Sequence, residues 1–112
     1  MSHLAERSCT PCHGGVPPLG PAAAQAFLAC LDPSWSVSDD GSALVRIVAL
    51  PNFHEVMAFV NAVAWIAHQE DHHPDMLVGF ASVELRYTTH ACGGLTDNDF
   101  ICAARVDRLL RG

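Results

Sequence analysis

Two short segments of the 112-residue chain have residue types that suit proton-transfer chemistry, Asp71-His72-His73-Pro74 and Thr88-Thr89-His90. Imidazole is the side chain whose unperturbed pKa lies closest to neutral pH, so histidines beside a carboxylate can act as general acid and base. Pro74 disfavours the helical conformation for the residue before it. We therefore predict that His72 stays on the last turn of a preceding helix while His73 begins the exit, so that both can line one hollow.

Two other interpretations of these histidines remain open. His72 and His73 could cap the last carbonyls of the helix, where a cationic side chain is favourable. Alternatively, three histidines with a carboxylate could bind zinc and activate water. Adjacent residues on a regular helix point roughly 100° apart, which disfavours one tetrahedral centre shared by His72 and His73. We therefore favour acid–base catalysis and expect no metal.

The segment before these histidines has the pattern of one long helix. Residues 53–70 contain no Gly or Pro, and Asn52 is a favourable N-cap. One apolar stripe runs along this helix, made of Val56, Phe59, Val60, Val63 and Ala67. Met57, Ala64 and Trp65 continue the apolar surface round the back. A helix that is apolar on all sides must be buried on all sides, so we expect a homo-oligomer with helix-to-helix contacts.

Four short segments have strand patterns, namely residues 35–37, 43–50, 76–80 and 82–89. The first two flank the turn signal Asp39-Asp40-Gly41, which predicts a hairpin. The fourth alternates cleanly, and its apolar face consists of Val83, Leu85 and Tyr87. By the same period, His90 belongs with the polar face of this strand.

Two further helices complete the pattern. Pro21 suits the first position of a helix over residues 22–31. Thr96 and Asp99 have the spacing of a capping box at the start of the last helix. The elements therefore follow the order α-β-β-α-β-β-α, which predicts an α+β fold with an antiparallel sheet.

The N-terminal residues 1–20 are polar, then rich in Gly and Pro, and predict a flexible or loosely docked arm before a domain over residues 21–112. Within the arm, Cys9-Thr10-Pro11-Cys12-His13 matches the pattern of c-type haem attachment. That chemistry needs an exported protein, and the sequence shows no signal peptide. A zinc knuckle using Cys9, Cys12 and two of His3, His13 or Cys30 is a further alternative. An arm carrying two thiols is the simplest interpretation.

The composition excludes several classes of protein. The net charge is −6, with six arginines and no lysine, so direct binding to nucleic acid or to an anionic membrane is not expected. No apolar run is long enough to cross a membrane. The five cysteines are an odd number and accompany no export signal, which favours reduced thiols and a cytoplasmic location.

With these motifs in place, the chain resembles the pterin-4a-carbinolamine dehydratases. The resemblance depends on Asp71-His72-His73-Pro74, Thr89-His90 and Gly94-Leu95-Thr96 with Asp99. Trp35 and Phe59-Val60-Asn61-Ala62-Val63 support it, and it covers roughly residues 20 to 110. One position departs from the mammalian members, which have a glutamate where this chain has His68.

The resemblance implies a four-stranded antiparallel sheet with helices packed on one face, assembled as a homodimer or homotetramer. It also implies an enzyme, a 4a-hydroxytetrahydrobiopterin dehydratase (a hydro-lyase). This reaction converts 4a-hydroxytetrahydropterin to quinonoid dihydropterin and so recycles the cofactor of an aromatic amino-acid hydroxylase such as phenylalanine hydroxylase. The pterin is the substrate, and no metal or organic cofactor is implied.

The same resemblance assigns residues to the site. The catalytic histidines are His72, His73 and His90, and the residues that shape or hold the pterin are Asp71, Trp35, Thr88, Thr89 and Asp99. Two of these have an alternative role, because Asp99 is explained as a capping residue and Trp35 as a core residue. The family also includes members that bind a transcription factor through their oligomerisation helices. A non-enzymatic partner protein is therefore the alternative function, ahead of a histidine-cluster metal-binding protein.

Overall fold

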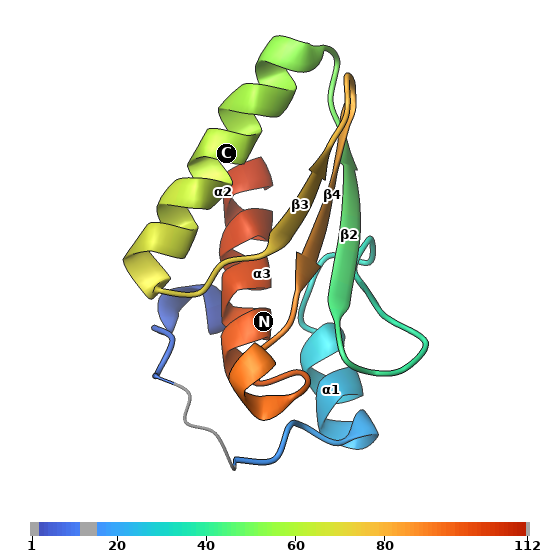
Figure 1. The fold of residues 1–112 in the computed structure, drawn as a ribbon, viewed down its shortest axis with the longest axis vertical. Coiled ribbons are helices and arrows are strands. Elements are labelled where there is room, and N and C mark those ends of the chain that lie inside the picture. Colours follow the sequence, from blue (N-terminus) through green and yellow to red (C-terminus); the bar gives the residue numbers. More distant parts are fainter. Residues whose placement is uncertain (1–2, 12–15, 112) are drawn as a thin grey trace.

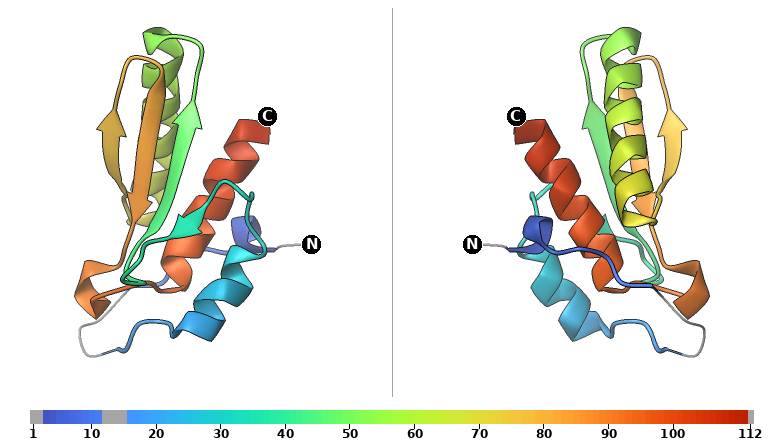
Figure 2. Two further views of the ribbon diagram at one scale, coloured as in Figure 1. Left: turned by 90° about the vertical axis from the view of Figure 1, so that its right-hand side faces the viewer. Right: turned by 90° about the vertical axis from the view of Figure 1, so that its left-hand side faces the viewer.

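A computed structural model describes residues 3–11 and 16–111 of the chain. Its four strands are β1 (Ser36–Val37), β2 (Leu44–Ala49), β3 (Asp75–Val78) and β4 (Ser82–Tyr87). Its α-helices are α1 (Pro21–Leu28), α2 (Phe53–Glu70) and α3 (Asp97–Arg111), and the short 3₁₀ helices are η1 (Leu4–Glu6) and η2 (His90–Cys92). The strands form one antiparallel sheet in the order β1-β2-β4-β3. Helices α2 and α3 lie on the same face of it (Figures 1 and 2), which confirms the predicted α+β fold.

The inner face of the sheet is formed by alternate residues of its two central strands. Leu44 and Val48 of β2 pair with Tyr87 and Val83 of β4, and all four are buried. The predicted alternation of β4 is therefore confirmed. The strand ends at Tyr87, two residues earlier than predicted, because the Thr88 hydroxyl donates to a carbonyl of the β1–β2 loop and the chain then turns into η2.

Helix α2 begins as predicted, since the Asn52 side chain accepts a hydrogen bond from the backbone N–H of Glu55 at 2.9 Å. It ends at Glu70, which is the last residue of the predicted helical segment. Asp71 adopts the left-handed conformation, with φ of +52°, and this conformation stops the helix after Glu70. The prediction that His72 stays on the last helical turn is therefore wrong: His72 follows the left-handed residue and lies outside the helix.

The buried stripe of α2 consists of Val56, Phe59, Val63 and Ile66. The side chains on the far side of the helix are not covered within the described residues, and Trp65 is 60% exposed and Phe53 44% exposed. No helix within residues 3–11 and 16–111 combines the length and apolarity needed to span a membrane.

The N-terminal segment lies against α3 over residues 3–11. Leu4 is buried, and η1 contacts α3 (Figure 2). The predicted domain boundary at residue 20 stays a prediction, although this part of the arm is docked. Cys12 and His13, on which the haem and zinc-knuckle interpretations depend, lie outside the described residues.

Candidate active site

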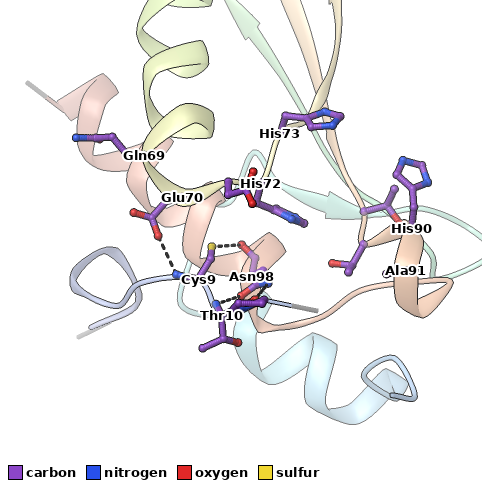
Figure 3. A pocket seen from close by; sticks show the side chains of 13 residues that line it. Cys9, Thr10, Gln69, Glu70, His72, His73, His90, Ala91 and Asn98 are labelled. Atoms are coloured by element: carbon purple, nitrogen blue, oxygen red, sulfur yellow. Dashed lines mark hydrogen bonds between the residues drawn. The ribbon is translucent and has the colours of Figure 1, made fainter. Parts of the chain in front are cut away.

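A pocket of about 520 Å³ opens where the C-terminal end of α2, the C-terminal end of β4 and the N-terminal arm meet (Figure 3). This volume is typical of small-molecule sites. Six of the residues assigned to the site line it, namely Asp71, His72, His73, Thr88, Thr89 and His90. The two histidine segments, separated in the sequence by a hairpin, therefore meet at one pocket.

His72 is held by a buried carboxylate. Its Nε2 lies 2.6 Å from Oδ1 of Asp99, whose side chain is fully buried, while the His72 side chain is 12% exposed. An ionised carboxylate only accepts hydrogen bonds, so the ring proton of His72 lies on Nε2 in this pair. The His72 ring also stacks on Tyr87, with centroids 6.1 Å apart and ring planes 9° from parallel. The orientation of this imidazole is thus fixed by a charge and by an aromatic face.

The second oxygen of Asp99 binds the opposite wall of the pocket. Its Oδ2 accepts from the Thr89 hydroxyl at 2.8 Å and from the backbone N–H of Thr96 at 2.9 Å, the latter being half of the predicted capping box. Because Thr89 gives its only hydroxyl proton to Asp99, the Thr96 hydroxyl donates to Thr89 Oγ1 at 2.8 Å. One carboxylate therefore connects the end of α2, the end of β4 and the start of α3.

His73 and His90 are held less tightly than His72. His73 Nδ1 has a long, 3.5 Å contact with the carbonyl of Pro74, and His90 is exposed at the start of η2. Figure 3 shows His90 on the far side of the pocket from Cys9 and Thr10, with His72 between them. The pocket thus combines one imidazole that a buried carboxylate holds with two more exposed imidazoles that have no such contact with Asp99.

Trp35 lies away from the pocket, in contrast to the role that the resemblance gives it. It is 3% exposed, and its indole N–H donates to Oδ1 of Asp107 at 2.7 Å. Arg46 pairs with the same oxygen at 2.6 Å. Trp35 is therefore part of the core and of a buried polar network beneath β2. Asp99 likewise does not line the pocket, but it contacts two residues that do.

Known proteins are similar in sequence to most of this chain. The sequence model of the pterin 4 alpha carbinolamine dehydratase family matches residues 17–109. The chain belongs to this family. A protein of Nitrosomonas eutropha, provisionally named a pterin-4-alpha-carbinolamine dehydratase, is 54% identical over 107 residues, which cover 96% of this chain and 93% of the relative. A protein of Dechloromonas aromatica with the same provisional name is 50% identical over 108 residues, covering 96% and 94%.

Solved structures give the same fold. The crystal structure described as a transcriptional coactivator/pterin dehydratase from Brucella melitensis has a TM-score of 0.78 and 25% identity, and covers 82% of this chain and 97% of that chain. A pterin dehydratase-like protein, described as a RuBisCO assembly factor of the alpha-carboxysome, has a TM-score of 0.59 and 23% identity over 68% of this chain and 88% of that one. The second likeness shows a shared fold only.

In this member of the pterin carbinolamine dehydratase family, the pocket residues that the sequence analysis did not assign to this site include Cys9, Thr10, Glu70 and Asn98. Their local sequence carries no signal for the contacts they make, which join the arm to α2 and α3. No group of three or more His, Cys, Asp or Glu residues is arranged to hold a metal ion in the described part of the chain.

Two buried groups beneath the pocket have raised pKa values. Burial raises the pKa of Tyr87 well above its ordinary value of 10.0. A hydrogen bond with Cys9, followed by burial, raises the pKa of the Cys102 thiol. Both groups therefore stay protonated and uncharged at neutral pH beside the His72–Asp99 pair.

Proposed function

We propose that this protein dehydrates 4a-hydroxytetrahydropterin to quinonoid dihydropterin by histidine acid–base catalysis. The observation that carries the proposal is the 2.6 Å contact between His72 Nε2 and the buried Asp99, in a pocket that His73 and His90 also line. Membership of the pterin carbinolamine dehydratase family supports the same reaction.

The reaction needs two proton transfers. One proton goes to the 4a-hydroxyl group, which leaves as water, and one is removed from the neighbouring ring nitrogen as the C=N double bond forms. A well-placed general acid or base contributes on the order of 10²–10⁴-fold to such a step. We assign the two transfers to His73 and His90, with His72 assisting from a position fixed by Asp99. Asp71, Thr88 and Thr89 supply polar groups for the pterin ring.

The biological setting follows from the reaction. The substrate is the product of an aromatic amino-acid hydroxylase, so we propose that this protein recycles the pterin of such an enzyme, for example phenylalanine hydroxylase. The thiols of Cys9, Cys30 and Cys102 form no disulfide, which supports a cytoplasmic location. The pterin is substrate, and the proposed mechanism uses no cofactor.

The direct test is the rate of 4a-hydroxytetrahydropterin dehydration with a chelator present. We expect the unmodified protein to accelerate the reaction, His90→Ala to lower kcat about 100-fold, and Asp99→Asn to lower it at least tenfold by releasing His72. A chelator that abolishes the rate would contradict metal-free catalysis. No acceleration over solvent by the unmodified protein would overturn the proposal.

Asp75→Asn is the matched control for Asp99→Asn, because Asp75 is exposed at the start of β3 and does not line the pocket. We expect its kcat to stay within about twofold of the unmodified protein. Thermal unfolding of every variant separates a lost catalytic group from a lost fold.

A further inference from the structure

The N-terminal arm forms one wall of the pocket. Cys9, Thr10 and Pro11 line it together with the histidines, although they are distant from them in the sequence. In Figure 3, Cys9 and Thr10 lie on the side of the pocket opposite His90 and Ala91. A flat ligand in this pocket would therefore lie between the arm and the end of β4.

A single amide side chain holds the middle of this wall. The backbone N–H of Thr10 donates to Oδ1 of Asn98 at 3.0 Å, and Nδ2 of Asn98 donates back to the carbonyl of Thr10 at 2.7 Å. This two-way pair fixes both polar backbone groups of one arm residue, in the way that a neighbouring strand would. Asn98 is 5% exposed, so water competes weakly for these bonds.

A buried carboxylate, that of Glu70, holds the residue before Thr10, which is Cys9. The backbone N–H of Cys9 donates to Oε1 of Glu70 at 2.8 Å, and Oε2 of Glu70 pairs with Arg105 at 3.4 Å. Arg105 also donates to the carbonyl of Arg7 at 2.8 Å. The Glu70 side chain is only 8% exposed. A buried charge of this kind is costly unless it is paired, and here its partners are an arginine of α3 and the arm.

We propose that Asn98 and Glu70 are positioning residues that hold Cys9–Pro11 as a substrate-contacting wall of the pterin pocket. This inference rests on the proposed function. Cys9–Pro11 include none of the three histidines. Undocking of this segment therefore leaves the proton-transfer groups in place, but the pterin ring loses one wall of its pocket. The wall therefore acts on substrate affinity, which appears in KM, more than on kcat.

The test compares KM and kcat for Asn98→Ala and Glu70→Ala. We expect each substitution to raise KM about tenfold and to change kcat less than about threefold, since one or two buried hydrogen bonds are lost. Glu70→Gln keeps an oxygen acceptor for Cys9, so its KM should lie closer to that of the unmodified protein. Glu84→Ala, on the open face of the sheet, is the control and should leave both constants unchanged.

A second experiment separates positioning by the arm from direct contact between Asn98 and the pterin. Cys9 Sγ and Cys102 Sγ lie 3.6 Å apart, so in a Cys12→Ser, Cys30→Ser, Cys92→Ser background diamide can oxidise the two thiols to a disulfide. Diamide accepts the two hydrogens and becomes a hydrazine. The bond fixes the arm on α3 even when the Asn98 amide is gone.

In the Asn98→Ala variant, this disulfide should return KM to within about twofold of the unmodified protein, and reduction with dithiothreitol should raise it again. A KM that stays high after the bond has formed, as judged by peptide mass, would mean that Asn98 acts on the substrate itself and would overturn the proposal. If Asn98→Ala fails to fold, the same comparison is made with Glu70→Ala.

Binding of 7,8-dihydrobiopterin distinguishes this inference from the proposed reaction. If the unmodified protein binds this pterin but catalyses no dehydration, the proposed function fails, and the ratio of Kd values for the same variants decides the role of the arm. If catalysis is present and neither KM nor Kd changes in Asn98→Ala and Glu70→Ala, the role of the arm is overturned and the proposed function stands.

Discussion

At the scale of the residue, the two carboxylate oxygens of Asp99 make different contacts, one with a helix end and one with His72. Its Oδ2 caps the start of α3, and its Oδ1 holds His72. A carboxylate near a helix N-terminus is stabilised by the exposed N–H groups of the first turn, so the charge that orients the imidazole is itself held at low cost. Removing this charge should therefore disturb both a helix end and the orientation of the His72 imidazole.

Tyr87 offers a stability test at the same scale. Its hydroxyl is buried and makes no hydrogen bond within the described residues. Since a buried polar group without a partner costs about 1–3 kcal/mol, Tyr87→Phe should raise the free energy of unfolding by about 1 kcal/mol at pH 8. Urea denaturation measures this difference. If Tyr87→Phe instead lowered the free energy of unfolding by more than about 1 kcal/mol, the Tyr87 hydroxyl would be stabilising the fold and the prediction would be wrong.

The same substitution has a predicted pH dependence. Burial raises the pKa of Tyr87 above 10.0, so above pH 10 the unfolded chain loses this proton while the folded chain keeps it. The folded state of the unmodified protein therefore loses stability as the pH rises past 10, and Tyr87→Phe removes that contribution. The difference in the free energy of unfolding between Tyr87→Phe and the unmodified protein, measured by urea denaturation, should therefore grow between pH 8 and pH 10.5.

The roles of single residues were only partly predictable. The residue types and motifs drew attention to His72, His73 and His90, which line one pocket, because imidazole chemistry and the position of Pro74 are local features. They did not predict that Trp35 lies in the core and donates a hydrogen bond to Asp107. This partner lies on α3, far along the chain. A side chain's partner across the fold is set by packing, which the local pattern does not contain.

At the scale of the element, the left-handed turn at Asp71 directs His72 toward Asp99. A side chain with a Cβ pays about 1–2 kcal/mol in this conformation, and branching at Cβ makes it worse. We expect Asp71→Gly to leave the free energy of unfolding within about 1 kcal/mol, and Asp71→Val to lower it by about 2 kcal/mol. Chemical denaturation of the pair checks this, and equal stability of the two variants would argue against strain at this turn.

The elements themselves were largely predictable, with errors at their ends. The Asn52 cap and the alternation in β4 are local signals, and both are confirmed. The end of α2 at Glu70 agrees with the predicted segment, but His72 was misplaced on its last turn because Asp71, a residue compatible with a helix, adopts a left-handed conformation. The end of β4 was misplaced because Thr88 bonds to a loop that is distant in the sequence.

At the scale of the whole molecule, the far side of α2 predicts self-association. Trp65 is 60% exposed there and contacts His68, with ring centroids 5.2 Å apart. We expect a homodimer or homotetramer, and we expect Trp65→Glu to shift it toward monomer by placing a charge in the contact. Light scattering at micromolar concentration measures the oligomeric state of the unmodified protein and of the variant. A stable monomer of the unmodified protein would contradict the prediction.

The docked arm was the least predictable part of the molecule. Its composition indicates flexibility, and nothing near Cys9 or Thr10 indicates Glu70 and Asn98 as partners. These bonds form only because α2 and α3 bring an acidic and an amide side chain to the same place. Residues 3–11 are thus ordered by the domain on which they lie, whereas the helices and strands follow from their own sequence.

The strand order also bears on how the chain folds. The central strands β2 and β4 pair from Leu44↔Tyr87 to Ala49↔Ser82, yet α2 and β3 lie between them in the sequence. The β3–β4 hairpin and α2 need only local contacts, whereas the central pairing must first close a long loop against chain entropy. Refolding speed should therefore be governed by this closure. The pocket needs a further long-range step, because residues 9–11 complete its wall only when they dock on Glu70 of α2 and Asn98 of α3.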